Sequence, residues 1–143
     1  MTAAVFAAVS AAYAAGHWAG DYWVQTHRQA CAKSSPGWAG RRACAAHVAT
    51  YTLTLAACLA LAAWRLGLPL SPGWTAAGLA VSAVTHYAAD RRRPLRALAA
   101  SVGKLAYHDL GDGLATGAAH LDQAWHWWWL FAAALITTGG IHG

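Results

Sequence analysis

Hydrophobic residues dominate four long stretches of this chain, and polar residues are concentrated in the segments between them. The stretches run approximately over residues 3–25, 43–64, 74–90 and 121–141. Each is close to the roughly 20 residues that an α-helix needs to cross about 30 Å of hydrocarbon. The pattern therefore predicts an all-α protein in which four antiparallel helices form one integral-membrane bundle, a single domain over residues 1–143.

The segments between the stretches differ in character. Ser34, Ser35, Pro36 and Gly37 are turn formers and indicate a loop between the first two stretches. After the third stretch, Pro94 suits the first turn of a helix. Apolar residues then recur at spacings of three and four, at Leu95, Leu98, Val102 and Leu105. A short amphipathic helix over about residues 94–106 is therefore expected, lying in the membrane interface between the third and fourth spans.

Composition supports the bilayer as the solvent of this chain. Hydrophobic residues make up 58% of it and charged residues only 10%, whereas soluble domains average about 25% charged residues. The net charge is +5, but the basic residues lie between the hydrophobic stretches and not along one soluble face. Membrane lipid, and not nucleic acid, is therefore the expected partner.

The distribution of lysine and arginine predicts an orientation in the membrane. The first loop carries Arg28, Lys33, Arg41 and Arg42, and the third carries Arg91, Arg92, Arg93, Arg96 and Lys104. The second loop carries at most Arg65. With four spans, the first and third loops share a side of the membrane, and the positive-inside rule makes that side cytoplasmic. We expect an inner-membrane, multi-pass protein with both termini outside.

Histidine and aspartate recur in pairs within the predicted spans. The pairs are His17/Asp21, His86/Asp90 and Asp122/His126, each spaced i,i+4, so that both members lie on one helix face. The order is reversed in the fourth span, which also runs in the opposite direction to the first and third. Together with His47, every pair falls in the cytoplasmic half of its span. An antiparallel bundle would bring them around one point.

This clustering points to a metal site. Unpaired charges in hydrocarbon cost at least about 2.5 to 3.5 kcal/mol each, and bundle metal sites are built from inward-facing ligands on several helices. The predicted ligands are His17, Asp21, His47, His86, Asp90, Asp122 and His126, around one ion or two that share a bridging carboxylate. Imidazole and carboxylate suit Zn²⁺ first, with Mn²⁺ or Fe²⁺ as alternatives. The competing interpretation is a hydrogen-bonded His/Asp relay without metal.

Three further polar residues are candidates for catalytic roles. An uncoordinated Asp122 would take a proton from metal-bound water. Gln25, one turn beyond Asp21, would orient a carboxylate or a water molecule, or would simply cap the helix. Lys33, with the arginines at 91–93, would hold an anionic headgroup or lipid-linked phosphate, or would serve only as a topology signal that binds anionic lipid.

These motifs resemble a family of small bacterial and phage integral-membrane proteins of unknown function. Its pattern combines H-x-x-x-D-x-x-x-Q, a loop lysine, a histidine early in the second helix, H-x-x-x-D and D-Q-x-x-H, and the match covers most of the chain. The matching positions are His17, Asp21, Gln25, Lys33, His47, His86, Asp90, Asp122, Gln123 and His126. The arrangement is also similar in style to membrane-bound metal-dependent hydrolases. Their usual H-R-x-x-T-H element is absent here, where residues 47–52 read HVATYT.

The leading functional hypothesis is a membrane-embedded metal-dependent hydrolase. It would act at the cytoplasmic interface on a phosphoryl or acyl ester of a lipid or lipid-linked molecule, and the hydrolase chemistry is what the second resemblance implies. The alternative is a non-enzymatic metal-binding protein: a metal or proton transporter, a metal-stabilised scaffold, or a membrane effector that oligomerises through small-residue helix faces. No phosphate-binding loop, dinucleotide fingerprint, GxSxG or HExxH motif is present.

Overall fold

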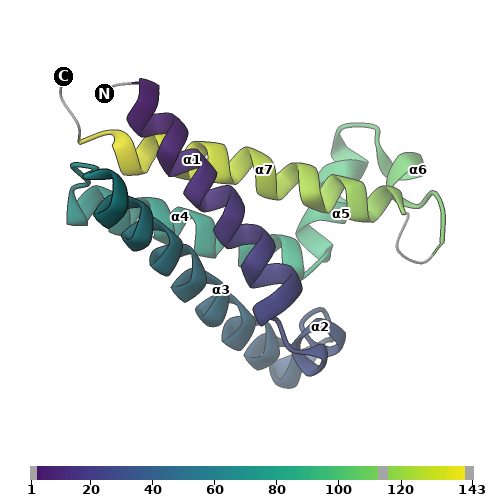
Figure 1. Ribbon diagram of the computed structural model, residues 1–143. Coiled ribbons are helices and arrows are strands. Elements are labelled where there is room, and N and C mark those ends of the chain that lie inside the picture. Colours follow the sequence, from purple (N-terminus) through teal and green to yellow (C-terminus); the bar gives the residue numbers. More distant parts are fainter. Residues whose placement is uncertain (1–2, 113–115, 141–143) are drawn as a thin grey trace.

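Four long helices run between the two ends of the molecule and form its body (Figure 1). They are α1 (Ala3–Trp18), α3 (Gly37–Leu66), α4 (Pro72–Asp90) and α7 (Gly117–Thr138). The structure is a computed structural model that describes residues 3–112 and 116–140, and all regular secondary structure within those ranges is helical. The all-α prediction is confirmed.

Shorter helices gather at one end of the body. In Figure 1, α2 (His27–Ala32), α5 (Arg93–Ser101) and α6 (Leu105–His108) lie at one end, whereas the start of α1, the end of α7 and the α3–α4 connection lie at the other. Every lysine and arginine of the chain except Arg65 lies in α2, in α5, in the first turns of α3, or in the connections next to these helices. We call this end the basic end. The two basic loops therefore share one end of the molecule, as the alternating direction of the helices requires.

Helix boundaries depart from the sequence prediction in ways that local chemistry explains. The predicted loop after residue 25 contains α2, which begins at a capping box: Thr26 accepts from the backbone N–H of Gln29 at 3.2 Å, and Gln29 accepts from that of Thr26 at 2.8 Å. The signature Ser/Thr-x-x-Glu/Gln is visible in the sequence. The helix expected over 94–106 is divided into α5 and α6, because Gly103 has a φ of 72° that ends a right-handed helix.

The long helices are close in extent to the four predicted spans. The prediction 43–64 falls within α3, and 74–90 falls within α4. The prediction 3–25 corresponds to α1 and the π-helical turn η1 (Ala19–Val24) that continues it, and 121–141 overlaps α7, although its last residue lies outside the described part of the chain. By length and composition, α3 is the one helix in residues 3–112 and 116–140 that qualifies as a membrane span.

Small residues allow the long helices to approach closely. A Cβ atom on Gly16 would lie 2.8 Å from Leu55 Cδ2, and one on Gly20 would lie 2.8 Å from Tyr51 Cδ2, so α1 packs directly on α3. Spacing of i,i+4 puts Gly16 of α1 and Gly20 of η1 on one face of this continuous helix. Toward the end of the molecule opposite the basic end, the core is apolar, made of Val9, Leu55, Leu59, Leu130, Ala133 and Ala134 among others. The buried histidines and Asp90, in contrast, lie nearer the basic end.

Candidate metal centre

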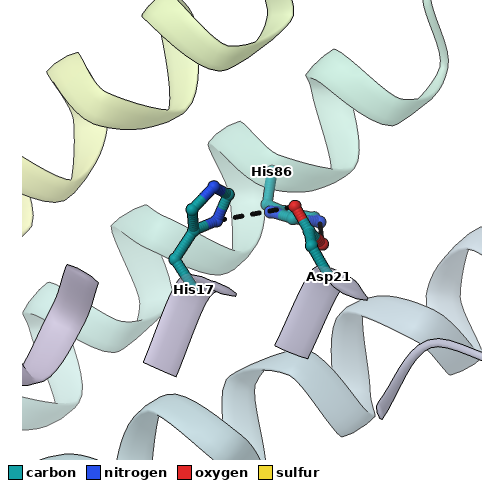
Figure 2. Close-up of side chains that lie close together, drawn as sticks. All are labelled: His17, Asp21 and His86. Carbon is teal, nitrogen blue, oxygen red and sulfur yellow. Dashed lines mark ion pairs between the residues drawn. The ribbon is translucent and has the colours of Figure 1, made fainter. Parts of the chain in front are cut away.

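The first pair of candidate ligands lies where α1 changes its winding. His17 belongs to the last turn of α1, and Asp21 lies in the π-helical turn η1. Such wider turns occur frequently at functional sites. His17 Nδ1 is 3.5 Å from Asp21 Oδ2, while the other carboxylate oxygen faces His86 from α4, as Figure 2 shows. The two oxygens of Asp21 therefore point to different histidines.

Ligand-type atoms from three helices converge around Asp21 Oδ1. This oxygen is 3.1 Å from His47 Nε2 and 3.3 Å from His86 Nε2. The two Nε2 atoms are themselves 3.0 Å apart. Asp90 Oδ2 joins them, at 3.5 Å from His47 Nε2 and 3.4 Å from His86 Nε2. We call Asp21, His47, His86 and Asp90 the central cluster.

The spacing within the central cluster matches a metal coordination shell. Nitrogen and oxygen ligands bind Zn²⁺ tetrahedrally at about 2.0 to 2.2 Å, which puts neighbouring ligand atoms about 3.4 Å apart. The Nε2 atoms of His47 and His86 are 3.0 Å apart, and each lies 3.1 to 3.5 Å from Asp21 Oδ1 and from Asp90 Oδ2. His47 and His86 are 0% and 1% exposed, so a cation held here would be enclosed by protein.

The Nδ1 atoms of both central histidines differ from those of a typical metal site. Metal-ligating histidines usually donate their second ring N–H to a carboxylate or carbonyl. Nδ1 of His47 and Nδ1 of His86 are buried and have no hydrogen-bond partner among the described residues. Both imidazoles make their polar contacts with Nε2, which faces the carboxylate oxygens of Asp21 and Asp90.

Lys33 lies against the central cluster and not free at the surface. Its Nζ is 2.6 Å from Asp90 Oδ1, and the two side chains are 18% and 3% exposed. Arg91 fixes the loop that carries Lys33, since its guanidinium donates to the carbonyls of Lys33 at 2.6 Å and Ser35 at 2.8 Å. The structure thus gives Lys33 an internal carboxylate partner, which orients the other oxygen of Asp90 toward the histidines.

His17 is held by two neighbours beside the central cluster. Its Nε2 is 3.3 Å from Gln123 Oε1, and its Nδ1 is 3.3 Å from the hydroxyl of Tyr51. Because an amide oxygen only accepts hydrogen bonds, Nε2 of His17 carries the proton and Nδ1 is left to face Asp21 and Tyr51. Metal-ligating histidines show the same arrangement, in which an acceptor beside one ring nitrogen fixes the tautomer.

Asp122 and His126 adjoin the cluster without entering it. The His126 ring stacks on His86 with centroids 4.4 Å apart, and Asp122 Oδ2 is 3.6 Å from His126 Nε2. Two groups of described residues are close enough to hold an ion, His17/Asp21/His86 and His47/His86/Asp90. The structure therefore brings five of the seven predicted ligands into these groups and leaves Asp122, whose side chain is 32% exposed, beside them.

Gln25 lies at the end of η1, one turn beyond Asp21. It caps the end of η1, where its backbone N–H donates to Gly20 O at 3.0 Å. Its side-chain Nε2 is buried, with no hydrogen-bond partner in the part of the chain that is described. The backbone of Gln25 thus ends the helix, and the role of its side chain stays a prediction.

Tyr51 is a functional candidate that the sequence analysis missed. Its ring stacks on His86 with centroids 3.8 Å apart, and it is 1% exposed. The only signal in the sequence is its position four residues after His47, which places both on one face of α3. A single tyrosine in an apolar helix otherwise looks like an ordinary packing residue.

The basic end also holds an exposed group of charges away from the cluster. Asp109, after α6, is 2.6 Å from His108 Nδ1 and 3.1 Å from Arg96 Nη2. The hydrogen bond from His108, assisted by Arg96, holds the pKa of the Asp109 carboxyl below its ordinary value. Asp109 is therefore a charged residue that links Arg96 of α5 to His108 of α6 through ion pairs.

Comparison of the chain with protein-family models, with curated proteins and with solved structures found no match.

Proposed function

We propose that this protein is a membrane-embedded metal-dependent hydrolase. Its substrate would be a phosphoryl or acyl ester of a lipid or lipid-linked molecule, reached from the cytoplasmic interface. The observation that carries the proposal is that Asp21 Oδ1 and Asp90 Oδ2 each lie 3.1 to 3.5 Å from the Nε2 atoms of His47 and His86, which are themselves 3.0 Å apart. Two carboxylates and two imidazoles in one buried cluster are donor groups that divalent transition metals bind.

The surface of the long helices supports placement in a membrane. Large apolar side chains are exposed along them, including Leu53, Leu61 and Trp64 on α3, Val84 on α4, and Trp128, Phe131 and Leu135 on α7. Soluble monomers rarely expose contiguous apolar patches larger than a few hundred Å². We therefore propose an integral four-helix bundle with the basic end at the cytoplasmic face and α5 in the interface.

A divalent ion in the central cluster would supply the chemistry of ester hydrolysis. Zn²⁺ is our first assignment, because imidazole and carboxylate ligands suit it, and it lowers the pKa of bound water to about 7. In hydrolysis the water oxygen bonds to the phosphorus or acyl carbon, the ester bond to the alcohol oxygen breaks, and the alcohol leaves with a proton. We assign the removal of the water proton to Asp122, which is partly exposed beside His126.

The apolar half of the bundle favours hydrolysis over transport. A transport path needs polar groups through both halves of the membrane. Away from the basic end, the helices pack through Val9, Leu55, Leu59 and Leu130, and the buried hydroxyls of Tyr13 and Thr137 bond to each other at 2.8 Å. The polar cluster is thus reached most directly from the basic end.

Metal analysis of the purified protein is the first test. We expect one Zn²⁺ or another divalent ion per chain in the wild type, and loss of it in His86→Ala and Asp21→Asn. His27→Ala is the matched control, because His27 lies on α2 at the surface. Absence of stoichiometric metal from the wild type would overturn the proposal.

An activity test follows on the same preparations. Mixed micelles that contain phosphoryl-ester and acyl-ester lipids are incubated with the protein, with the chelated protein, and with chelated protein to which metal is returned. We expect hydrolysis that is lost with the metal, restored by it, and reduced by at least 100-fold in Asp122→Asn, since a general base contributes about 10²- to 10⁴-fold.

One observation favours a second candidate, a non-enzymatic protein in which metal only joins the helices. Structural metal sites are closed by four protein ligands, whereas catalytic sites keep an open position. The central cluster offers four residues, and His47 and His86 are almost completely buried. Stoichiometric metal without hydrolysis of either ester class, and with a large loss of thermal stability on chelation, would support this candidate over the hydrolase.

A further inference from the structure

An apolar groove lies between α5 and α7, outside the metal centre. Its volume is about 370 Å³, within the range of small-molecule sites in proteins. The lining side chains include Leu98 and Val102 from α5 and Trp125 and Trp128 from α7. Trp128, Leu98 and Val102 are among the exposed large hydrophobic residues, so the groove is an open apolar surface and not part of the packed core.

One cation marks the edge of this groove. Lys104, just after α5, is the single charged residue that lines it, and it forms no ion pair within residues 3–112 and 116–140. The neighbouring Arg96, in contrast, is paired with Asp109 at 3.1 Å. An apolar groove with an unpaired ammonium at its edge is complementary to an amphiphile that has an acyl chain and an anionic headgroup.

The wall of the groove is shared with the elements that carry the centre. The indole N–H of Trp125 donates to the carbonyl of Thr85 at 3.0 Å, and Thr85 directly precedes His86. Leu121, another lining residue, directly precedes Asp122. A chain bound in the groove would therefore lie beside the helical turns that hold His86 and Asp122.

We propose that the α5–α7 groove binds an acyl chain of an anionic phospholipid from the bilayer, with the headgroup phosphate at Lys104. The assignment rests on the membrane placement and lipid-linked substrate class proposed above, and it defines that class further as an anionic lipid. The apolar walls bind the chain because they remove it and themselves from water at the interface. Lys104 adds the preference for negative charge, through an electrostatic attraction to anionic lipid.

Photo-crosslinking with an anionic lipid tests the groove directly. The full chain is placed in phosphatidylcholine vesicles that contain a small fraction of phosphatidylglycerol with a diazirine on its acyl chain, and the labelled peptides are mapped. We expect the label to concentrate on the peptides of α5 and of residues 121–129. Ala124→Trp, which fills the groove from an exposed position, should reduce that labelling at least fivefold.

Matched variants make the result specific. Ala97→Trp adds the same ring to an exposed position of α5 that does not line the groove, and it should leave the labelling unchanged. Lys104→Gln should reduce the preference for the phosphatidylglycerol probe over a phosphatidylcholine probe at least threefold, whereas Arg42→Gln on α3 should not.

Three outcomes would overturn the groove assignment. The first is labelling spread over all helices in proportion to their exposed surface, and the second is labelling that Ala124→Trp leaves intact. The third is a crosslink between two copies of the chain at this groove in place of lipid. These results are independent of metal: specific labelling of a protein that binds no metal removes the hydrolase and keeps the lipid site. Metal-dependent hydrolysis together with dispersed labelling would keep the hydrolase and remove the lipid site.

Discussion

Asp21 Oδ1 and His47 Nε2 lie 3.1 Å apart, although 26 residues separate them and they belong to η1 and α3. Neither side chain has a favourable place in an apolar helix alone, because burying an unpaired polar group costs free energy. Together with His86 and Asp90 they form a cluster in which each polar group compensates the others. Because its residues come from η1, α3 and α4, binding of a cation or proton by the cluster should stabilise the packing of these helices.

Metal should stabilise the fold through this coupling. A ligand that binds only the folded state at 100 times its Kd adds about 2.7 kcal/mol to the free energy of unfolding. We expect the Tm of the wild type to fall on chelation and to recover with Zn²⁺. His47→Ala should abolish this dependence, and Asp109→Asn, at an exposed position outside the cluster, should keep it. An equal metal response in His47→Ala and the wild type would contradict the assignment of His47 as a ligand.

Lys33 should contribute most to the free energy of unfolding when the metal is absent. Replacing it by Met leaves the carboxylate of Asp90 buried without its ammonium partner at 2.6 Å. Breaking a buried pair costs about 3 to 5 kcal/mol, so we expect a loss of that order in the free energy of unfolding of the metal-free protein. Added metal should reduce the loss, because the cation compensates Asp90 instead. Arg28→Met on α2 is the control. A similar loss of unfolding free energy in this variant would mean that removing any charge at the basic end has the same effect.

Tyr51 should support the metal centre mainly through its ring. Tyr51→Phe keeps the stack on His86 and removes the hydroxyl that lies 3.3 Å from His17 Nδ1. A lost hydrogen bond costs about 1 kcal/mol. Tyr51→Leu removes the stack as well and should weaken metal binding roughly 10- to 100-fold, as loss of residues that orient metal ligands does. Metal titration of both variants checks the difference, and equal affinities would show that the ring does not position His86.

Two glycines of α4 provide a matched test of helix packing. A Cβ atom on Gly78 would approach the carbonyl of Ala133 and the Tyr13 hydroxyl to 2.8 Å each, whereas one on Gly73 would have nothing within 4 Å. Overpacking of this kind costs about 1 to 3 kcal/mol. We expect Gly78→Ala to lower the Tm measured by circular dichroism, and Gly73→Ala to leave it unchanged or raise it slightly, since alanine favours helix. Equal shifts would mean that α4 and α7 are farther apart in solution.

Thiol labelling in intact cells tests the membrane orientation. Cys31 is exposed at the basic end, whereas Cys44 is buried. If the basic end is cytoplasmic, a membrane-impermeant maleimide should label Cys31 only after the cells are opened. A cysteine introduced by Pro69→Cys, at the exposed α3–α4 connection, should react in intact cells. The opposite pattern would reverse the orientation, and labelling of both cysteines in intact cells would contradict it.

Much of the fold was predictable because the length of an apolar stretch and the turn residues that follow it determine where a helix begins and ends. The stretches of apolar residues predicted the long helices, and Gly67, with a φ of 62°, ends α3 where the apolar run ends. The short helix α2 was missed because its signal is a capping box, Thr26 with Gln29, and not a hydrophobic stripe. The expected amphipathic helix is divided at Gly103, whose positive φ cannot continue a right-handed helix. The apolar spacing on both sides of this glycine did not reveal the break.

Spacing of i,i+4 in the sequence already puts each histidine–aspartate pair on one helix face, and the order of the spans puts these pairs in one half of the bundle. Which atoms meet could not be predicted in this way, because the rotation and depth of each helix depend on packing contacts such as Gly16 on Leu55 and Gly20 on Tyr51. Those contacts bring Asp21, His47, His86 and Asp90 together and leave Asp122 and His126 beside them. A shift of one helix by a fraction of a turn would select a different set from the same residues.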